Sequence, residues 1–205
     1  MKKLLVFLFL VLIFNSLWSQ EKFLEYKNFY QNFTYDIFID KDRKSGDFTL
    51  VFYANPVNAK DTVGFFITRN EYNNFFTSLT KARDKYDEWI KVAEEYKVMS
   101  YTRKMKMFFD AAGFFFVNKD IHSFYPVTVS FNFTIQESND KKHAIYILSL
   151  ESVPYASSKD QMLSTEGFSI QFYSLDDLNS FVDAISIDKI NEYTPMPTLD
   201  ELFQD

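Results

Sequence analysis

The 205-residue sequence has no cysteine, only two histidines and only four glycines, and each scarcity excludes a class of protein. Without cysteine there is no disulfide scaffold, no thiolate zinc site and no cysteine nucleophile. Four isolated glycines are too few for the glycine-rich loops that hold phosphate groups. The Gly-x-Ser-x-Gly and His-Glu-x-x-His patterns of serine hydrolases and zinc proteases are also missing. We therefore expect neither a metal nor a cofactor.

Positive charge is also in short supply, because the formal net charge is −6. An acidic balance argues against a main role in binding nucleic acid or anionic lipid. Aromatic side chains, in contrast, are abundant: 25 Phe, 13 Tyr and 2 Trp. Disordered acidic chains lack such material, whereas each aromatic ring in a core buries roughly 150–250 Å². The composition predicts a folded domain with an aromatic core.

Residues 1–19 have the three-part pattern of a secretory signal peptide. Lys2 and Lys3 precede an unbroken apolar run, Leu4–Phe14, and a polar stretch follows it. The run is shorter than the ~20 apolar residues that a membrane span requires. Leu17 stands where a small residue is preferred before the cut, so an uncleaved anchor is the alternative. We expect export to a bacterial periplasm or exterior, with no lipid anchor and no membrane span after signal removal.

A long helix is predicted over residues 69–97. Thr68 and Glu71 have the spacing of a capping box at its start. Large or apolar residues then recur at alternating steps of three and four from Tyr72 to Tyr96. The stripe is aromatic and alanine-rich, whereas coiled coils favour Leu, Ile and Val. We expect the helix to lie across a sheet, and contact with a partner helix is the alternative.

Much of the remaining chain alternates between apolar and polar residues, as half-buried antiparallel strands do. The predicted strands cover residues 33–39, 48–53, 63–67, 99–109, 113–117, 127–135, 143–150 and 168–172. Ser174 caps a second, shorter predicted helix over about 175–185. The sequence therefore predicts an α+β fold: a mainly antiparallel sheet of seven or eight strands, with one long helix (about 69–97) and one short helix (about 175–185) packed on it.

We expect residues 20–205 to form a single domain, since a chain of this length is most often one unit. The segment that begins at Gly64 resembles the segment that begins at Gly167, because each leads from a short strand into a capped helix. This similarity raises the alternative of two duplicated strand–helix halves with a break near residue 98.

The aromatic segment 113–126 is predicted to be a short apolar strand followed by a loop. Its rings offer stacking faces to an apolar ligand or a sugar, and it contains one of the two histidines. The candidate ligand-binding residues in it are Phe114, Phe116, His122 and Tyr125. Core packing of the phenylalanines and an exposed loop histidine are the alternatives.

A second candidate is the cationic and aromatic stretch around Arg103. Lys104 and Lys106 are basic as well, and Tyr101 and Phe108 flank them. Such a stretch suits an anionic ligand or a polysaccharide, with a solvated strand face as the alternative. Arg103 is therefore the fifth candidate ligand-binding residue.

Adjacent carboxylates occur at Glu94–Glu95, Asp176–Asp177 and Asp200–Glu201. A glycosidase needs two carboxylates that face each other at about 5–9 Å, whereas neighbours on a helix point apart. We therefore predict a secreted or periplasmic non-enzymatic module that binds an unknown ligand or protein partner. The alternatives are a carboxylate-based hydrolase acting on glycan or cell-wall material, and a structural or assembly protein that uses the long helix. A wet or apolar cavity lined by tyrosine between the long helix and the sheet would favour a small ligand, whereas a dense core there would favour a surface-interaction role.

Overall fold

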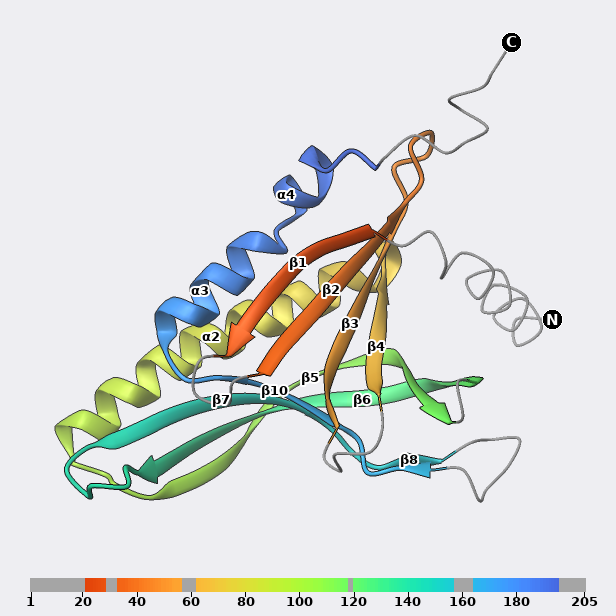
Figure 1. Ribbon diagram of the computed structural model, residues 1–205. Coiled ribbons are helices and arrows are strands. Elements are labelled where there is room, and N and C mark those ends of the chain that lie inside the picture. The colour runs from red at the N-terminus through yellow and green to blue at the C-terminus, as the bar shows by residue number, and fades with distance from the viewer. Residues whose placement is uncertain (1–20, 29–32, 57–61, 118–119, 157–163, 196–205) are drawn as a thin grey trace, which may run out of the picture.

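The computed structural model describes residues 21–28, 33–56, 62–117, 120–156 and 164–195, so the predicted signal peptide lies outside the described residues. The strands are β1 (Glu21–Asn28), β2 (Phe33–Lys41), β3 (Phe48–Pro56), β4 (Val63–Thr68), β5 (Tyr101–Val117), β6 (Asp120–Glu137), β7 (Ala144–Ser152), β8 (Tyr155–Ala156), β9 (Ser164–Thr165) and β10 (Phe168–Phe172). The helices are α2 (Arg69–Glu95), α3 (Leu175–Ala184) and α4 (Ile187–Glu192). The predicted α+β fold is confirmed (Figure 1). Within the described ranges, no helix is long and apolar enough to cross a membrane.

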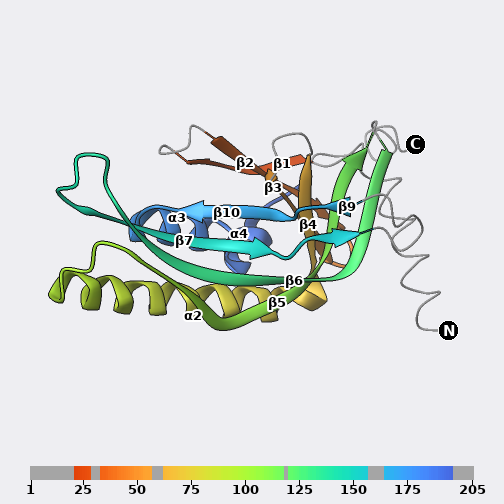
Figure 2. The same cartoon turned by 90° about the horizontal axis from the view of Figure 1, so that it is seen from below.

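Eight of the strands form one antiparallel sheet in the order β1-β2-β3-β10-β7-β6-β5-β4. β3 also pairs with β4, so the pairings from β3 through β10, β7, β6, β5 and β4 return to their starting strand. β1–β4 run steeply across the long strands β5–β7 (Figures 1 and 2), which is the strong twist that such a closed circuit requires. β8 and β9 form a separate two-stranded sheet.

α2 is the predicted long helix, and it begins as the sequence indicates. The Glu71 carboxylate accepts a hydrogen bond from the backbone N–H of Thr68 at 3.0 Å, which completes the capping box. The stripe of α2 that faces the sheet is buried and consists of Tyr72, Phe75, Ser78, Leu79, Ala82, Tyr86 and Ala93. The Tyr72 hydroxyl donates to the Ile185 carbonyl at 2.9 Å, and the Tyr86 hydroxyl donates to that of Tyr146 at 3.0 Å. These bonds join α2 to the end of α3 and to β7.

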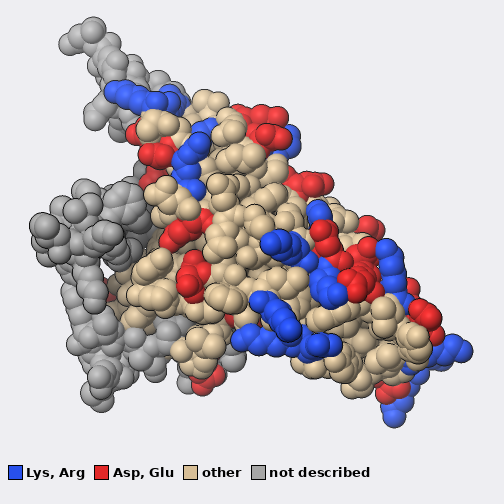
Figure 3. Space-filling view, turned by 180° about the vertical axis from the view of Figure 1, so that it is seen from behind, with Lys and Arg blue, Asp and Glu red and all other residues tan. Residues whose placement is uncertain are grey.

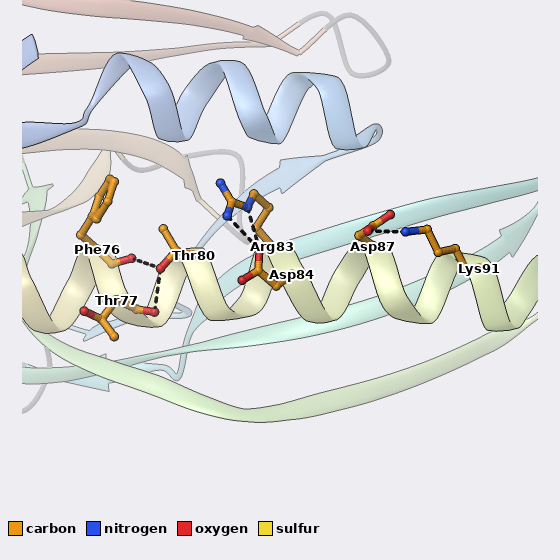
Figure 4. Close-up of polar contacts among 7 residues, drawn as sticks. All are labelled: Phe76, Thr77, Thr80, Arg83, Asp84, Asp87 and Lys91. Atoms are coloured by element: carbon orange, nitrogen blue, oxygen red, sulfur yellow. Dashed lines mark hydrogen bonds and ion pairs between the residues drawn. The ribbon is translucent and has the colours of Figure 1, made fainter.

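Polar contacts line the outward side of α2 (Figure 4). Lys91 binds Asp87, four residues earlier on the helix, at 2.7 Å. Arg83 binds Asp84 at 2.8 Å. The Thr80 hydroxyl donates to the Phe76 carbonyl one turn earlier at 2.9 Å. This side of α2 is therefore solvated along much of its length.

The structure corrects the prediction for residues 99–126. The two strands predicted there are one strand, β5, and the predicted aromatic loop 113–126 is the end of β5 and the beginning of β6. Gly113 does not interrupt β5, because it pairs with Phe65 of β4 on one side and with Phe124 of β6 on the other. Strand pairing on both sides outweighs the weak local preference of a glycine for a turn.

Four further elements were not predicted: the strands β1, β8 and β9 and the short helix α4. β1 is a charged edge strand whose Phe23, Leu24 and Tyr26 pack against the core from one border of the sheet. The β4–α2 and β10–α3 units both lie on this one sheet, and their origin by duplication stays a prediction.

Lys41, the last residue of β2, holds the end of α4. Its ammonium group donates to the carbonyl oxygens of Ile190 at 2.7 Å, Asn191 at 2.9 Å and Tyr193 at 2.7 Å. Carbonyl groups at the C-terminal end of a helix lack helical partners, and a positive charge there interacts favourably with the negative end of the helix dipole. The contact thus ties the C-terminal part of the described chain to the sheet.

Replacing Lys41 with methionine keeps the aliphatic stem and removes the three hydrogen bonds. We expect local opening of α4 to become easier by about 1–2 kcal/mol, because charge-assisted bonds are strong but this one is partly exposed. Hydrogen exchange at the Ile190 amide, which donates to the Ser186 carbonyl, should accelerate roughly tenfold. Lys44→Met, in the neighbouring turn, is the control and should leave that exchange unchanged. Equal exchange in both variants would show that Lys41 does not hold α4.

Candidate functional site

A cavity of about 250 Å³ opens between the C-terminal half of α2 and the β5–β6 pair. Its walls are formed by Trp89, Val92, Ala93, Val98, Tyr101, Arg103, Phe133 and Ile135. The three α2 residues are spaced three and four apart and therefore share one side of the helix. On the sheet, Tyr101 pairs with Ile135 and Arg103 pairs with Phe133, so these four side chains share one face. The cavity therefore lies near the C-terminal end of the apolar stripe of α2.

Trp89 is the central ring of this cavity. The Arg103 guanidinium lies 5.4 Å from the centroid of the Trp89 ring, and the Lys85 ammonium lies 5.6 Å from it. The Phe133 ring lies 5.4 Å away at an interplanar angle of 57°. Cations at these distances are attracted to the electron-rich face of an indole ring. Trp89 therefore holds the Arg103 side chain at the border of the cavity.

The cavity is apolar, and its one charged lining residue is Arg103. Among the described residues, Arg103 forms no ion pair with an acid, whereas Lys85 binds Glu88 at 2.7 Å. Burial raises the pKa of Tyr146, which lies close to Phe133, and the Glu94 carboxylate raises it further, so this phenol stays neutral. Figure 3 shows the back of the molecule, with basic side chains across its middle and acidic side chains around them.

The other four predicted site residues lie at the opposite end of the β5–β6 hairpin. Phe114 is fully buried with Val51 and Phe66 in a second, smaller apolar cluster, and the partly buried Phe116 packs against that cluster. Packing accounts for both residues. The structure therefore separates the five candidates into two places, with Arg103 alone at the cavity.

His122 and Tyr125 are the two polar members of that second group. The His122 ring stacks on Phe115 at 5.5 Å, whereas Tyr125 is 54% exposed. A binding role for this end of the hairpin stays a prediction.

Six of the eight cavity residues are not predicted from the sequence, and the exceptions are Arg103 and the nearby Tyr101. Trp89, Ala93 and Phe133 were interpreted as ordinary core positions, because each continues a helical or strand stripe. One signal was present in the sequence: the stripe of large or apolar residues continues to Tyr96, which follows the last residue of α2. In the structure Val92 is 47% exposed and Tyr96 is 70% exposed, which marks the uncovered end.

In the ranges the structure describes, no group of three or more His, Asp or Glu side chains could hold a metal ion. Glu94 and Glu95 are exposed, and Asp176 and Asp177 lie in the first turn of α3. The Asp177 backbone N–H donates to the Ser174 hydroxyl at 3.1 Å, so this acidic pair belongs to the start of a helix. The pair Asp200–Glu201 lies outside the described residues.

No family model, curated protein or solved structure matches this chain. Function has to be inferred from the geometry and chemistry of the cavity. An arrangement of apolar walls, one indole ring and one unpaired guanidinium can bind a group that is apolar at one end and negatively charged at the other.

Proposed function

We propose that the protein is an exported, non-enzymatic module that binds a ligand in the cavity between α2 and the β5–β6 pair. The observation that carries the proposal is an apolar cavity with a cation at its border and no acid among its lining residues. An apolar group placed there leaves water, which stabilises binding by roughly 25 cal/mol for each Å² buried. A negative group on the same ligand reaches Arg103.

The size of the cavity limits what enters it. Sites for drug-sized molecules have roughly 300–1,000 Å³, whereas this cavity has about 250 Å³. One ring or one branched side chain fits, and the rest of a larger ligand stays outside. The ligand is therefore either small or anchored by a single apolar group.

The predicted signal peptide supports export, so the ligand is one that an exported protein meets. The hydrolase alternative is less supported, because the lining of this cavity has no carboxylate to act as acid or nucleophile. The assembly alternative is also less supported, because seven residues of the α2 stripe are buried inside the domain.

The test uses Trp89, which is the one tryptophan outside residues 1–19. The probe is anilinonaphthalene sulfonate, whose rings are apolar and whose sulfonate is negative. We expect the probe to quench Trp89 fluorescence and to bind about three- to tenfold more weakly to the Arg103→Gln variant, since one exposed charge contact is lost. Tyr101→Ser, at the cavity, should also weaken binding.

Tyr125→Ser is the matched control, because Tyr125 and Tyr101 are exposed tyrosines at opposite ends of the same hairpin, 54% and 46% exposed. We expect this control to bind the probe like the unmodified protein. If Tyr125→Ser weakens binding while Tyr101→Ser and Arg103→Gln do not, the site lies at the other end of the hairpin and the proposal fails.

A further inference from the structure

β5 has an unpaired edge beside the cavity. On the side away from β6, β4 pairs with β5 only at residues 112–115, and no described strand pairs with residues 101–111. Figure 1 shows β5 along the lower border of the sheet. α2 contacts this stretch through a hydrogen bond from the Ser78 hydroxyl to the Phe108 carbonyl at 3.2 Å and through the Trp89 ring beside Arg103. Residues 101–104 pair regularly with β6, so alternate backbone N–H and C=O groups there point away from the sheet, and the register with β6 is interrupted between Lys104 and Phe108.

Side chains on both faces of the sheet are exposed along this edge. All four side chains from Tyr101 to Lys104 are exposed, and Lys106 is exposed as well. The opposite border of the sheet differs, because on β1 Lys22 binds both Glu25 and Asp36. A strand edge that carries such internal ion pairs offers few free charges to a partner, whereas the β5 edge offers several.

Three cations surround the β5 edge. Arg103 lies on the cavity face of the sheet. Lys104 and Lys106 lie on the opposite face, and the buried Met105 stands between them in the sequence. Within the described chain none of the three forms an ion pair with an acid, although Lys85, Lys91 and Lys189 elsewhere do. The protein as a whole is acidic, so this is a local concentration of unpaired positive charge.

Two carboxylates share the face of Lys104 and Lys106, and both have partners within the sheet. Asp110 accepts a hydrogen bond from the Thr128 hydroxyl at 2.7 Å. Glu151 accepts one from the Asn132 side chain. The two carboxylates are thus bound to neighbours on their own sheet.

We propose that an extended peptide segment with alternating acidic and apolar residues adds to the β5 edge over residues 101–106. The inference rests on the proposed function, because an apolar side chain of the added segment enters the cavity beside Arg103. Backbone hydrogen bonds to the unpaired edge supply affinity, and the alternate side chains supply specificity. Acidic side chains on the other face meet Lys104 and Lys106.

A peptide explains more of this surface than the other occupants do. A second copy of the chain added to the same edge would bring its own cations against Arg103, Lys104 and Lys106. An acidic polysaccharide would use the cations, but it has no row of peptide groups to match the unpaired backbone and no apolar side chain for the cavity.

The probe is a capped synthetic peptide that alternates glutamate with valine and phenylalanine, titrated against the full mature chain by Trp89 fluorescence. We expect Lys104→Glu/Lys106→Glu to bind the peptide about tenfold more weakly, because attraction becomes repulsion. The control variant Lys27→Glu/Lys44→Glu makes the same change in net charge, but its substitutions lie on β1 and in the β2–β3 turn. We expect it to bind the peptide as the unmodified protein does. Hydrogen exchange should slow at residues 101–106 in the complex.

A second peptide carries methyl groups on alternate backbone nitrogens, in both registers, with its side chains unchanged. We expect its affinity to fall at least about tenfold, since it cannot complete the strand. Equal binding of the methylated peptides would overturn strand addition. Binding of polygalacturonate without binding of either peptide would assign the surface to a polysaccharide instead. In the unmodified protein, binding of the sulfonate probe without binding of the peptide would refute this inference alone, whereas failure to bind either would refute the proposed function. Lys104→Glu/Lys106→Glu keeps Arg103 and the cavity, so we expect it to bind the sulfonate probe as the unmodified protein does.

Discussion

Phe65→Ala should lower the free energy of unfolding by about 3–5 kcal/mol, the range expected when a buried phenylalanine is truncated. Phe65 is fully buried and stacks between two other rings, Phe52 at 4.6 Å and Phe168 at 5.0 Å. These three rings belong to β4, β3 and β10, the strands at which the circuit of pairings closes. The substitution therefore leaves a cavity that neighbouring strands cannot fill without breaking their register.

Urea denaturation followed by Trp89 fluorescence measures the change. Folded domains are stable by roughly 5–15 kcal/mol, so a loss of this size brings the variant close to unfolding. Phe108→Ala is the matched control, because Phe108 is 58% exposed on β5. We expect the control to change the free energy of unfolding by no more than about 0.5 kcal/mol. Similar losses in the two variants would mean that the Phe65 stack is not the centre of the core.

Gly64→Ala is the second large effect that we expect, and its cause is lack of space. A Cβ atom on Gly64 would lie 2.0 Å from the Phe52 carbonyl oxygen and 2.5 Å from the Phe114 ring. The carbonyl belongs to the backbone of the paired strand β3, so it cannot rotate away as a side chain can. We expect a loss of about 3 kcal/mol or more, at the upper end of the cost of overpacking. Loss of soluble protein on expression would be the extreme form of the same effect.

Gly46→Ala separates this steric effect from the general cost of replacing glycine. Gly46 lies in the β2–β3 turn at φ +72°, and nothing lies within 4 Å of the position of a Cβ there. Only the left-handed backbone is unfavourable for alanine, which costs about 1–2 kcal/mol. If both glycine variants unfold at the same urea concentration, the close approach of β3 and β4 at Gly64 does not constrain the fold.

α2 shows what local sequence signals predict well. The capping box at Thr68 and the alternating apolar steps depend on residues only three or four positions apart, and the structure has both. The end of α3 at Ala184 is likewise close to the predicted residue 185. Interactions of this range are present in the sequence itself, so no knowledge of distant partners is needed.

Gly113 and β1 show where such signals fail. A glycine inside an apolar run favours a break, yet β4 and β6 pair with it on both sides and continue the strand. β1 has charged residues at Lys22, Glu25 and Lys27, which obscured its strand pattern, and its pairing with β2 defines it as a strand. In each case a partner far away in the sequence decides the outcome.

The candidate site likewise has a part that the sequence predicts and a part that depends on residues distant in the sequence. Arg103 was predicted from the sequence, because a cationic and aromatic stretch is visible in the residues themselves. Its partner Trp89 precedes it by fourteen positions on another element, and the 5.4 Å between the guanidinium and the ring centroid exists only when α2 lies across β5. Phe114 shows the converse: its aromatic neighbours suggested a ligand site, and the fold buries it in a small core.

The composition of the sequence therefore determined several things without a structure: the lack of cysteine excludes disulfides and thiolate chemistry, and the abundance of aromatic residues predicts an aromatic core. Capping and periodicity determined the two main helices. Only the tertiary structure decided that β5 is one long strand with a free edge, and that a cavity lies between this strand and the end of α2. The physical reason is that strand pairing and cavity formation depend on residues that are distant in sequence, whereas helix formation depends on near neighbours.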